Sequence, residues 1–181
     1  VGVGGGASLF DSKLSGGVQG VFAGVADTKV ALTRVVVTRQ APHADSDVRA
    51  VGMAVVRGAR VTVAQSVIRD LVADGAAVVE EDGVVDLTET LVRDVHIGGA
   101  AARGSGLLAA LGGHLVVRSS AISAIERAAV VVRDQGSSLE LGSSTVRGPN
   151  GNETTPPPGL VSDGKGAGVS VVGKAKASLD D

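Results

Sequence analysis

Two Arg-Asp dipeptides, Arg69-Asp70 and Arg93-Asp94, are the groups in this sequence best suited to chemistry. Each follows a Ser or Thr by three residues, and Arg147 ends a third copy of the same local pattern. Two carboxylates held side by side could bind a cation such as Ca²⁺, and the neighbouring guanidinium groups would suit an acidic sugar. The alternative is structural: Asp bonds backbone N–H groups at a bend, and Arg spreads over the outer surface. We favour the structural interpretation, because surface ion pairing forms easily.

Two histidines and one acidic run are the other candidates for metal binding. His43 and His96 lie in inserted segments of the same kind and could approach one another. Neither has a third ligand at a fixed spacing, so we predict no metal site and no resident cofactor. The acidic run at residues 80–82 could attract Ca²⁺, although most such runs are hydrated turns.

The Arg-Asp dipeptides belong to an internal repeat. The segment "GARVTVAQSVIRD" (Gly58 to Asp70) has five further copies, and three positions in each are apolar. The first is Ala7, Val30, Val61, Val85, Leu115 and Leu139; the second is Leu9, Leu32, Val63, Leu87, Val117 and Leu141; the third is Leu14, Val37, Ile68, Val92, Ile122 and Val146. A fourth position is Ser or Thr in five copies (Ser12, Ser66, Thr90, Ser120 and Ser144) and Val35 in the other. We expect these hydroxyl groups to form a hydrogen-bonded stack at a bend, because no His stands in register to activate them.

A further short apolar pair follows each copy. The pairs are Val21/Ala23, Met53/Val55, Ala76/Val78, Leu107/Ala109, Ala129/Val131 and Val169/Val171. The basic unit is therefore 23 to 24 residues long, and additional residues enter the second, fourth and sixth units over 40–51, 95–105 and 149–167. Insertions confined to one point of a repeat map to one side of a solenoid.

The repeat predicts an all-β fold. A strand of three to five residues cannot bury its apolar face alone, but identical strands stacked from successive turns can bury it together. No hairpin signal joins the strands, so the sheets must be parallel, and crossover handedness favours a right-handed parallel β-helix solenoid of about six coils. The chain is 44% hydrophobic with two Phe, no Tyr and no Trp, so Val, Leu, Ile and Ala must fill the interior.

The "S-x-[VI]-R-D" ending, with its glycine-led strands, resembles the repeats of right-handed parallel β-helix proteins of the pectin-lyase-like group. The resemblance covers nearly the whole chain. It implies the fold but no single function, because that fold carries lyases, hydrolases, tailspikes, adhesins and inert stalks. No catalytic motif of the family is matched, so no catalytic residue is assigned.

A second pair of acids, Asp86 and Glu140, shares one predicted outward position two coils apart. Their backbones should lie about 9.6 Å apart, near the separation used by inverting glycosidases. Val116 stands between them and offers neither acid nor donor. Alternation on an exposed sheet face explains the pair more simply.

Composition excludes several classes of partner. The formal net charge is −2 without a basic stripe, and aromatic residues are nearly absent, so we expect no nucleic-acid binding. No stretch of eighteen apolar residues predicts a membrane-spanning helix. With no cysteine there are no disulfides. These features favour a non-catalytic structural or adhesive module of a secreted or cell-surface protein, whose one-sided loops would meet a polysaccharide or a protein.

Two other functions remain open: a polysaccharide lyase or glycoside hydrolase, and a self-assembly module that stacks end to end. The segment "KASLDD" (Lys176 to Asp181) reads as the start of a seventh unit, with Ala177 and Leu179 in the first two apolar positions. We therefore expect residues 1–181 to form a single β-helix domain that is a piece of a longer solenoid, because solenoid ends need caps.

Overall fold

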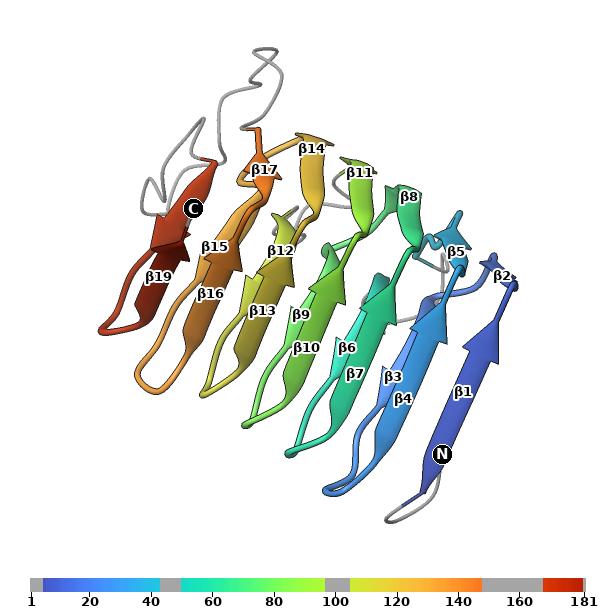
Figure 1. The fold of residues 1–181 in the computed structure, drawn as a ribbon, viewed down its shortest axis with the longest axis horizontal. Coiled ribbons are helices and arrows are strands. Elements are labelled where there is room, and N and C mark those ends of the chain that lie inside the picture. Colours follow the sequence, from blue (N-terminus) through green and yellow to red (C-terminus); the bar gives the residue numbers. More distant parts are fainter. Residues whose placement is uncertain (1–4, 43–49, 97–104, 148–167, 181) are drawn as a thin grey trace.

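Three short strands recur in each repeat, and each joins a separate parallel sheet. The computed structural model describes residues 5–42, 50–96, 105–147 and 168–180. Within them, 19 strands form a seven-stranded and two six-stranded sheets, and every pairing is parallel. Three strands, one from each sheet, make one coil of a parallel β-helix (Figure 1).

The sheets are named A, B and C in the order in which the chain enters them. Sheet A holds β1 (Gly6–Phe10), β4 (Lys29–Thr33), β7 (Arg60–Ala64), β10 (Val84–Thr88), β13 (His114–Arg118), β16 (Ser138–Gly142) and β19 (Lys176–Asp180). Sheet B holds β2 (Lys13–Ser15), β5 (Val36–Thr38), β8 (Val67–Val72), β11 (Leu91–His96), β14 (Ala121–Ile125) and β17 (Thr145–Val146). Sheet C holds β3 (Gln19–Ala23), β6 (Val51–Val55), β9 (Gly75–Val79), β12 (Ser105–Ala109), β15 (Val130–Val132) and β18 (Val169–Val171).

The chain winds in a right-handed sense. In Figure 1 the strands of sheet A run upward in front of sheet C, and each coil lies to the left of the one before it. The strand β19 begins a seventh coil, since Ala177 pairs with Leu139 and Leu179 with Leu141. The predicted parallel β-helix architecture and the place of Lys176–Asp180 in a seventh coil are therefore confirmed.

The apolar columns of sheets A and B follow the predicted register. Val30, Val61 and Val85 are successive partners in the first column, and Val37, Ile68 and Val92 are successive partners in the third. Central members of both columns, such as Val61, Val85 and Ile68, are fully buried. Because aliphatic side chains stack on their own kind in neighbouring coils, the core needs no aromatic ring.

Sheet C differs from the prediction by one residue in two coils. Ala77 and Val79, rather than Ala76 and Val78, stand beside Met53 and Val55. Likewise Val130 and Val132, rather than Ala129 and Val131, pair with Leu107 and Ala109. Residues 76–79 and 128–132 are continuously apolar, so alternation of apolar and polar residues does not distinguish the two registers there.

Left-handed backbone forms the corner between sheets A and B in each coil. The residues are Asp11, Arg34, Gln65, Glu89, Ser119 and Ser143, with φ between 47° and 54°. Such a conformation costs a non-glycine residue roughly 1–2 kcal/mol. The N–H of each residue donates to a carbonyl of the next coil, as from Gln65 to Thr88 at 3.1 Å. The ladder between coils thus continues through the corner and offsets this cost.

Each insertion enters between a sheet B strand and the following sheet C strand. Residues 43–49, 97–104 and 148–167, which form most of the three insertions, lie outside the described residues. The described strands on either side place all three insertions at the same corner of the coil, between β5 and β6, β11 and β12, and β17 and β18. Within the described residues no helix is long and apolar enough to cross a membrane.

Candidate functional site

The two Arg-Asp dipeptides lie in neighbouring coils on the outer surface of sheet B. Arg69 on β8 and Arg93 on β11 are register partners. Each pairs with its own neighbour: Arg69 Nε lies 3.6 Å from Asp70 Oδ2, and Arg93 Nε lies 3.4 Å from Asp94 Oδ2. All four side chains are partly exposed. The carboxylates are therefore already accompanied by cations of the same chain.

The backbone at these dipeptides has a recurrent left-handed bend. Asp70 and Asp94 have φ of 54° and 55°, and Gly16, Arg39 and Ala124 have the same handedness at the corresponding place in their coils. Because Gly, Arg, Asp and Ala all form this bend, it does not require a carboxylate. Our structural interpretation expected Asp to bond backbone N–H groups here. Instead, Asp70 accepts a 3.4 Å hydrogen bond from the Thr38 hydroxyl and faces its neighbouring guanidinium.

The third arginine of the pattern stands apart from the first two. Val146 pairs with Ile122, which puts Arg147 beside Ser123 and Ser123 beside Arg93. Arg147 is exposed, and its backbone N–H donates to the Ile122 carbonyl at 2.9 Å. One uncharged residue, Ser123, therefore separates Arg147 from the Arg69–Arg93 pair.

Of the two candidate histidines, one is described. His96 ends β11 beside Val72 and is exposed. His43 lies outside the described residues, so an approach between the two stays a prediction. Among residues 5–42, 50–96, 105–147 and 168–180, no three His, Cys, Asp or Glu side chains gather closely enough to hold a metal ion.

The acids Asp86 and Glu140 are joined by an arginine that sequence analysis missed. They stand on either side of Val116 on the outer face of sheet A, as predicted. From the middle strand, Arg118 reaches both: Nη1 lies 3.4 Å from Asp86 Oδ2, and Nη2 lies 2.5 Å from Glu140 Oε1. Strand alternation was the signal that could have found it, because Arg118 follows Val116 by two residues on the same face.

The hydroxyl groups of the fourth column bind backbone rather than each other. Ser66 Oγ accepts from the Val35 N–H at 3.0 Å and donates to the Ala64 carbonyl at 2.7 Å. Ser120 and Ser144 repeat both bonds in later coils. The predicted stack is therefore present, but each link runs from a hydroxyl to the backbone of the preceding coil.

Another exposed ion pair joins the first two coils. Arg34 Nη2 donates to Asp11 Oδ2 at 2.8 Å, and a second bond runs from Arg34 Nε to the same carboxylate. This bidentate hydrogen bonding lowers the pKa of the Asp11 carboxyl and raises the pKa of Arg34. The pair lies at the corner between sheets A and B.

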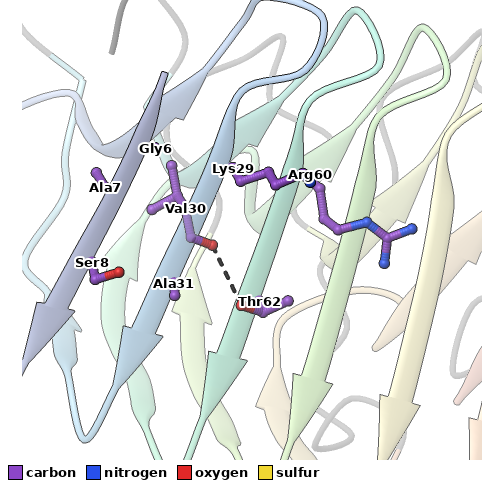
Figure 2. Close-up of a pocket in the computed structure, with 8 residues that line it drawn as sticks. All are labelled: Gly6, Ala7, Ser8, Lys29, Val30, Ala31, Arg60 and Thr62. Carbon is purple, nitrogen blue, oxygen red and sulfur yellow. Dashed lines mark hydrogen bonds between the residues drawn. The ribbon is translucent and has the colours of Figure 1, made fainter. Parts of the chain in front are cut away.

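A shallow depression of about 300 Å³ lies on the outer face of sheet A, over the first three coils. Figure 2 shows its lining, which comes from β1, β4 and β7. Lys29 and Arg60 stand at one side, and Ser8, Ala31 and Thr62 form the floor. Its charged groups are cationic, whereas the candidate Arg-Asp site is charge-balanced.

A smaller depression of about 140 Å³ lies on the outer face of sheet C. Ala54, Val78 and Leu108 make an apolar floor, and Asp74 and Glu80 add acidic groups at its sides. Asp74 has a polar partner of its own. This surface is thus apolar at its centre and acidic at its margin, the opposite charge to the depression on sheet A.

Comparison of this chain with protein-family models, with curated proteins and with solved structures found no match.

Proposed function

We propose that this chain is a non-catalytic structural or adhesive β-helix module of a secreted or surface-exposed protein. The observation that carries the proposal is the pairing of its candidate acids. Asp70, Asp94, Asp86 and Glu140 each face an arginine within 3.6 Å. We infer that these side chains hold the surface of the solenoid together and do not carry out a reaction.

Asp86 and Glu140 share one arginine and are partly exposed to water. A general acid or general base must exchange its proton with the substrate or with a bound water. Both carboxyl groups are instead held by the Arg118 guanidinium, which supports a structural role over the acid and base roles of an inverting glycosidase.

A polysaccharide lyase or glycoside hydrolase is the second candidate, and the register of Arg69 with Arg93 favours it. Their carboxylate neighbours sit in adjacent coils, where a cation and an acidic sugar could meet. This second candidate would also make the chain a relative of the pectin-lyase-like group, which is a proposal. We further propose that the protein is extracellular and that it does not bind nucleic acid.

Incubation with acidic polysaccharides, with and without Ca²⁺, separates the two candidates. We expect the polymers to keep their length under both conditions. Cleavage that is lost in Asp70→Ala or Asp94→Ala would show that the Arg-Asp site is catalytic and would refute the proposal. Thr145→Ala, an exposed substitution on the same sheet, is the matched control for the fold.

A further inference from the structure

The outer face of β1, β4 and β7 carries two neighbouring cations. Lys29 and Arg60 are register partners, so their backbones lie about 4.8 Å apart. Both side chains are exposed, and neither makes an ion pair with an acid within the described part of the chain. Arg34, Arg57 and Arg118, in contrast, each face a carboxylate.

Like charges opposite one another on a sheet are destabilising. Lys29 and Arg60 therefore repel each other, and no acid stands between them in the described face. The remaining outward residues of the three strands are uncharged: Gly6, Ser8, Phe10, Ala31, Thr33, Thr62 and Ala64. A bound anion would relieve the repulsion. The next strand, β10, carries Asp86 beside Thr62, and that carboxylate already faces Arg118.

The floor beside the cations is small and polar. Ser8, Ala31 and Thr62 follow one another across the three coils. The Thr62 hydroxyl donates to the Val30 carbonyl at 3.5 Å, which leaves its oxygen able to accept (Figure 2). Short side chains leave the depression of about 300 Å³ open to solvent, so a flat ligand can lie directly on the sheet.

An exposed aromatic ring lies on the same face. Phe10 alternates with Gly6 and Ser8 along β1 and is 57% exposed. It is one of only two Phe in an otherwise aromatic-free chain. Gly6 is the register partner of Lys29, and Phe10 follows Gly6 by four residues. The two positions are therefore about 13 Å apart along the strand direction. An apolar platform and a cationic pair therefore mark the two sides of one surface.

We propose that this face of β1, β4 and β7 binds an acidic polysaccharide. Its carboxylate or sulfate groups lie at Lys29 and Arg60, its hydroxyl groups meet Ser8 and Thr62, and an apolar sugar face rests on Phe10. A nucleic acid fits less well, because two cations on a chain of net charge −2 give little phosphate neutralisation. The inference rests on the proposed function, since it names what an adhesive module would hold.

Binding of the whole chain to immobilised polymers tests this surface. The polymers are polygalacturonate, which carries carboxylates, heparin, which carries sulfates, and dextran, which is neutral. We expect binding to at least one acidic polymer and none to dextran; the polymer retained identifies the acid. Lys29→Ala/Arg60→Ala should weaken that binding about tenfold or more, because it removes both cations that face the acidic groups of the polymer. Phe10→Ala should weaken it by a smaller factor.

Lys13→Ala/Arg39→Ala is the matched control, because it removes two exposed cations from the sheet B side. It should leave binding unchanged. The inference fails if the wild type binds neither acidic polymer, if dextran binds equally well, or if the two double variants behave alike. A different result would refute the proposed function, namely the release of shortened polymer. That release is measured in the same samples, whether or not the protein binds the immobilised polymer.

Discussion

Single residues at the corners of each coil join that coil to the neighbouring coils. Ser66, Ser120 and Ser144 each accept a backbone N–H of the preceding coil and donate to a carbonyl two residues back. Each hydroxyl thus satisfies two polar groups at a bend. Val35, which lacks a hydroxyl, still supplies its N–H to Ser66 and packs its side chain into the core.

Ser66→Ala should lower the free energy of unfolding by about 1–3 kcal/mol, because it leaves the buried Val35 N–H without its acceptor. Denaturant unfolding followed by circular dichroism measures the change. Ser8→Ala, which alters an exposed serine on β1, should differ little from the wild type. Equal stability of the two variants would show that the hydroxyl column does not join the coils.

The Asp11–Arg34 pair predicts a local pH dependence. Because Arg34 lowers the pKa of Asp11, the stabilisation by this pair is present above the unfolded-state pKa and is lost as pH falls through the folded-state pKa. The side chains are exposed, so we expect a small effect on stability. NMR titration of the Asp11 carboxyl should give a midpoint below the usual Asp range, and Arg34→Gln should raise it. An unchanged midpoint in Arg34→Gln would contradict the assignment.

The alternation of apolar and polar residues along individual strands determines which side chains face the core. The inward residues of sheets A and B are read directly from the sequence because Val, Leu and Ile alternate with polar residues there. The predicted register of sheet C was wrong by one residue in two coils, because residues 76–79 and 128–132 are continuously apolar and show no alternation. Arg118 was missed because its role depends on a side chain spanning three coils, which a periodic pattern does not specify.

The register of β7 and β8 predicts different effects for a charge introduced at Thr62 and at Ile68, which lie six residues apart in the sequence. Ile68 is fully buried, so Ile68→Asp should cost several kcal/mol or prevent folding. Thr62 is exposed on sheet A, so Thr62→Asp should cost little. Thermal unfolding of both variants measures the difference. A severe loss in Thr62→Asp together with a mild loss in Ile68→Asp would reverse the assigned faces.

For the molecule as a whole, the same stacking that builds the core also distributes charge over three faces. Sheet A carries the cationic Lys29–Arg60 surface and the Asp86–Arg118–Glu140 cluster, sheet B carries the Arg-Asp dipeptides, and sheet C carries an apolar depression. The fold could be predicted from the sequence, because every coil repeats the same pattern of apolar and polar residues. The candidate site was predicted poorly, because a functional site would consist of residues that differ from one coil to the next.

An NMR titration of the labelled chain with an acidic oligosaccharide is the most direct test of binding without catalysis. We predict that amide shifts concentrate in Gly6–Phe10, Lys29–Thr33 and Arg60–Ala64, and that the ligand signals keep the same chemical identity for the duration of the experiment. Shifts centred on Arg69-Asp70 and Arg93-Asp94, accompanied by new signals from a shortened or unsaturated sugar, would contradict this account.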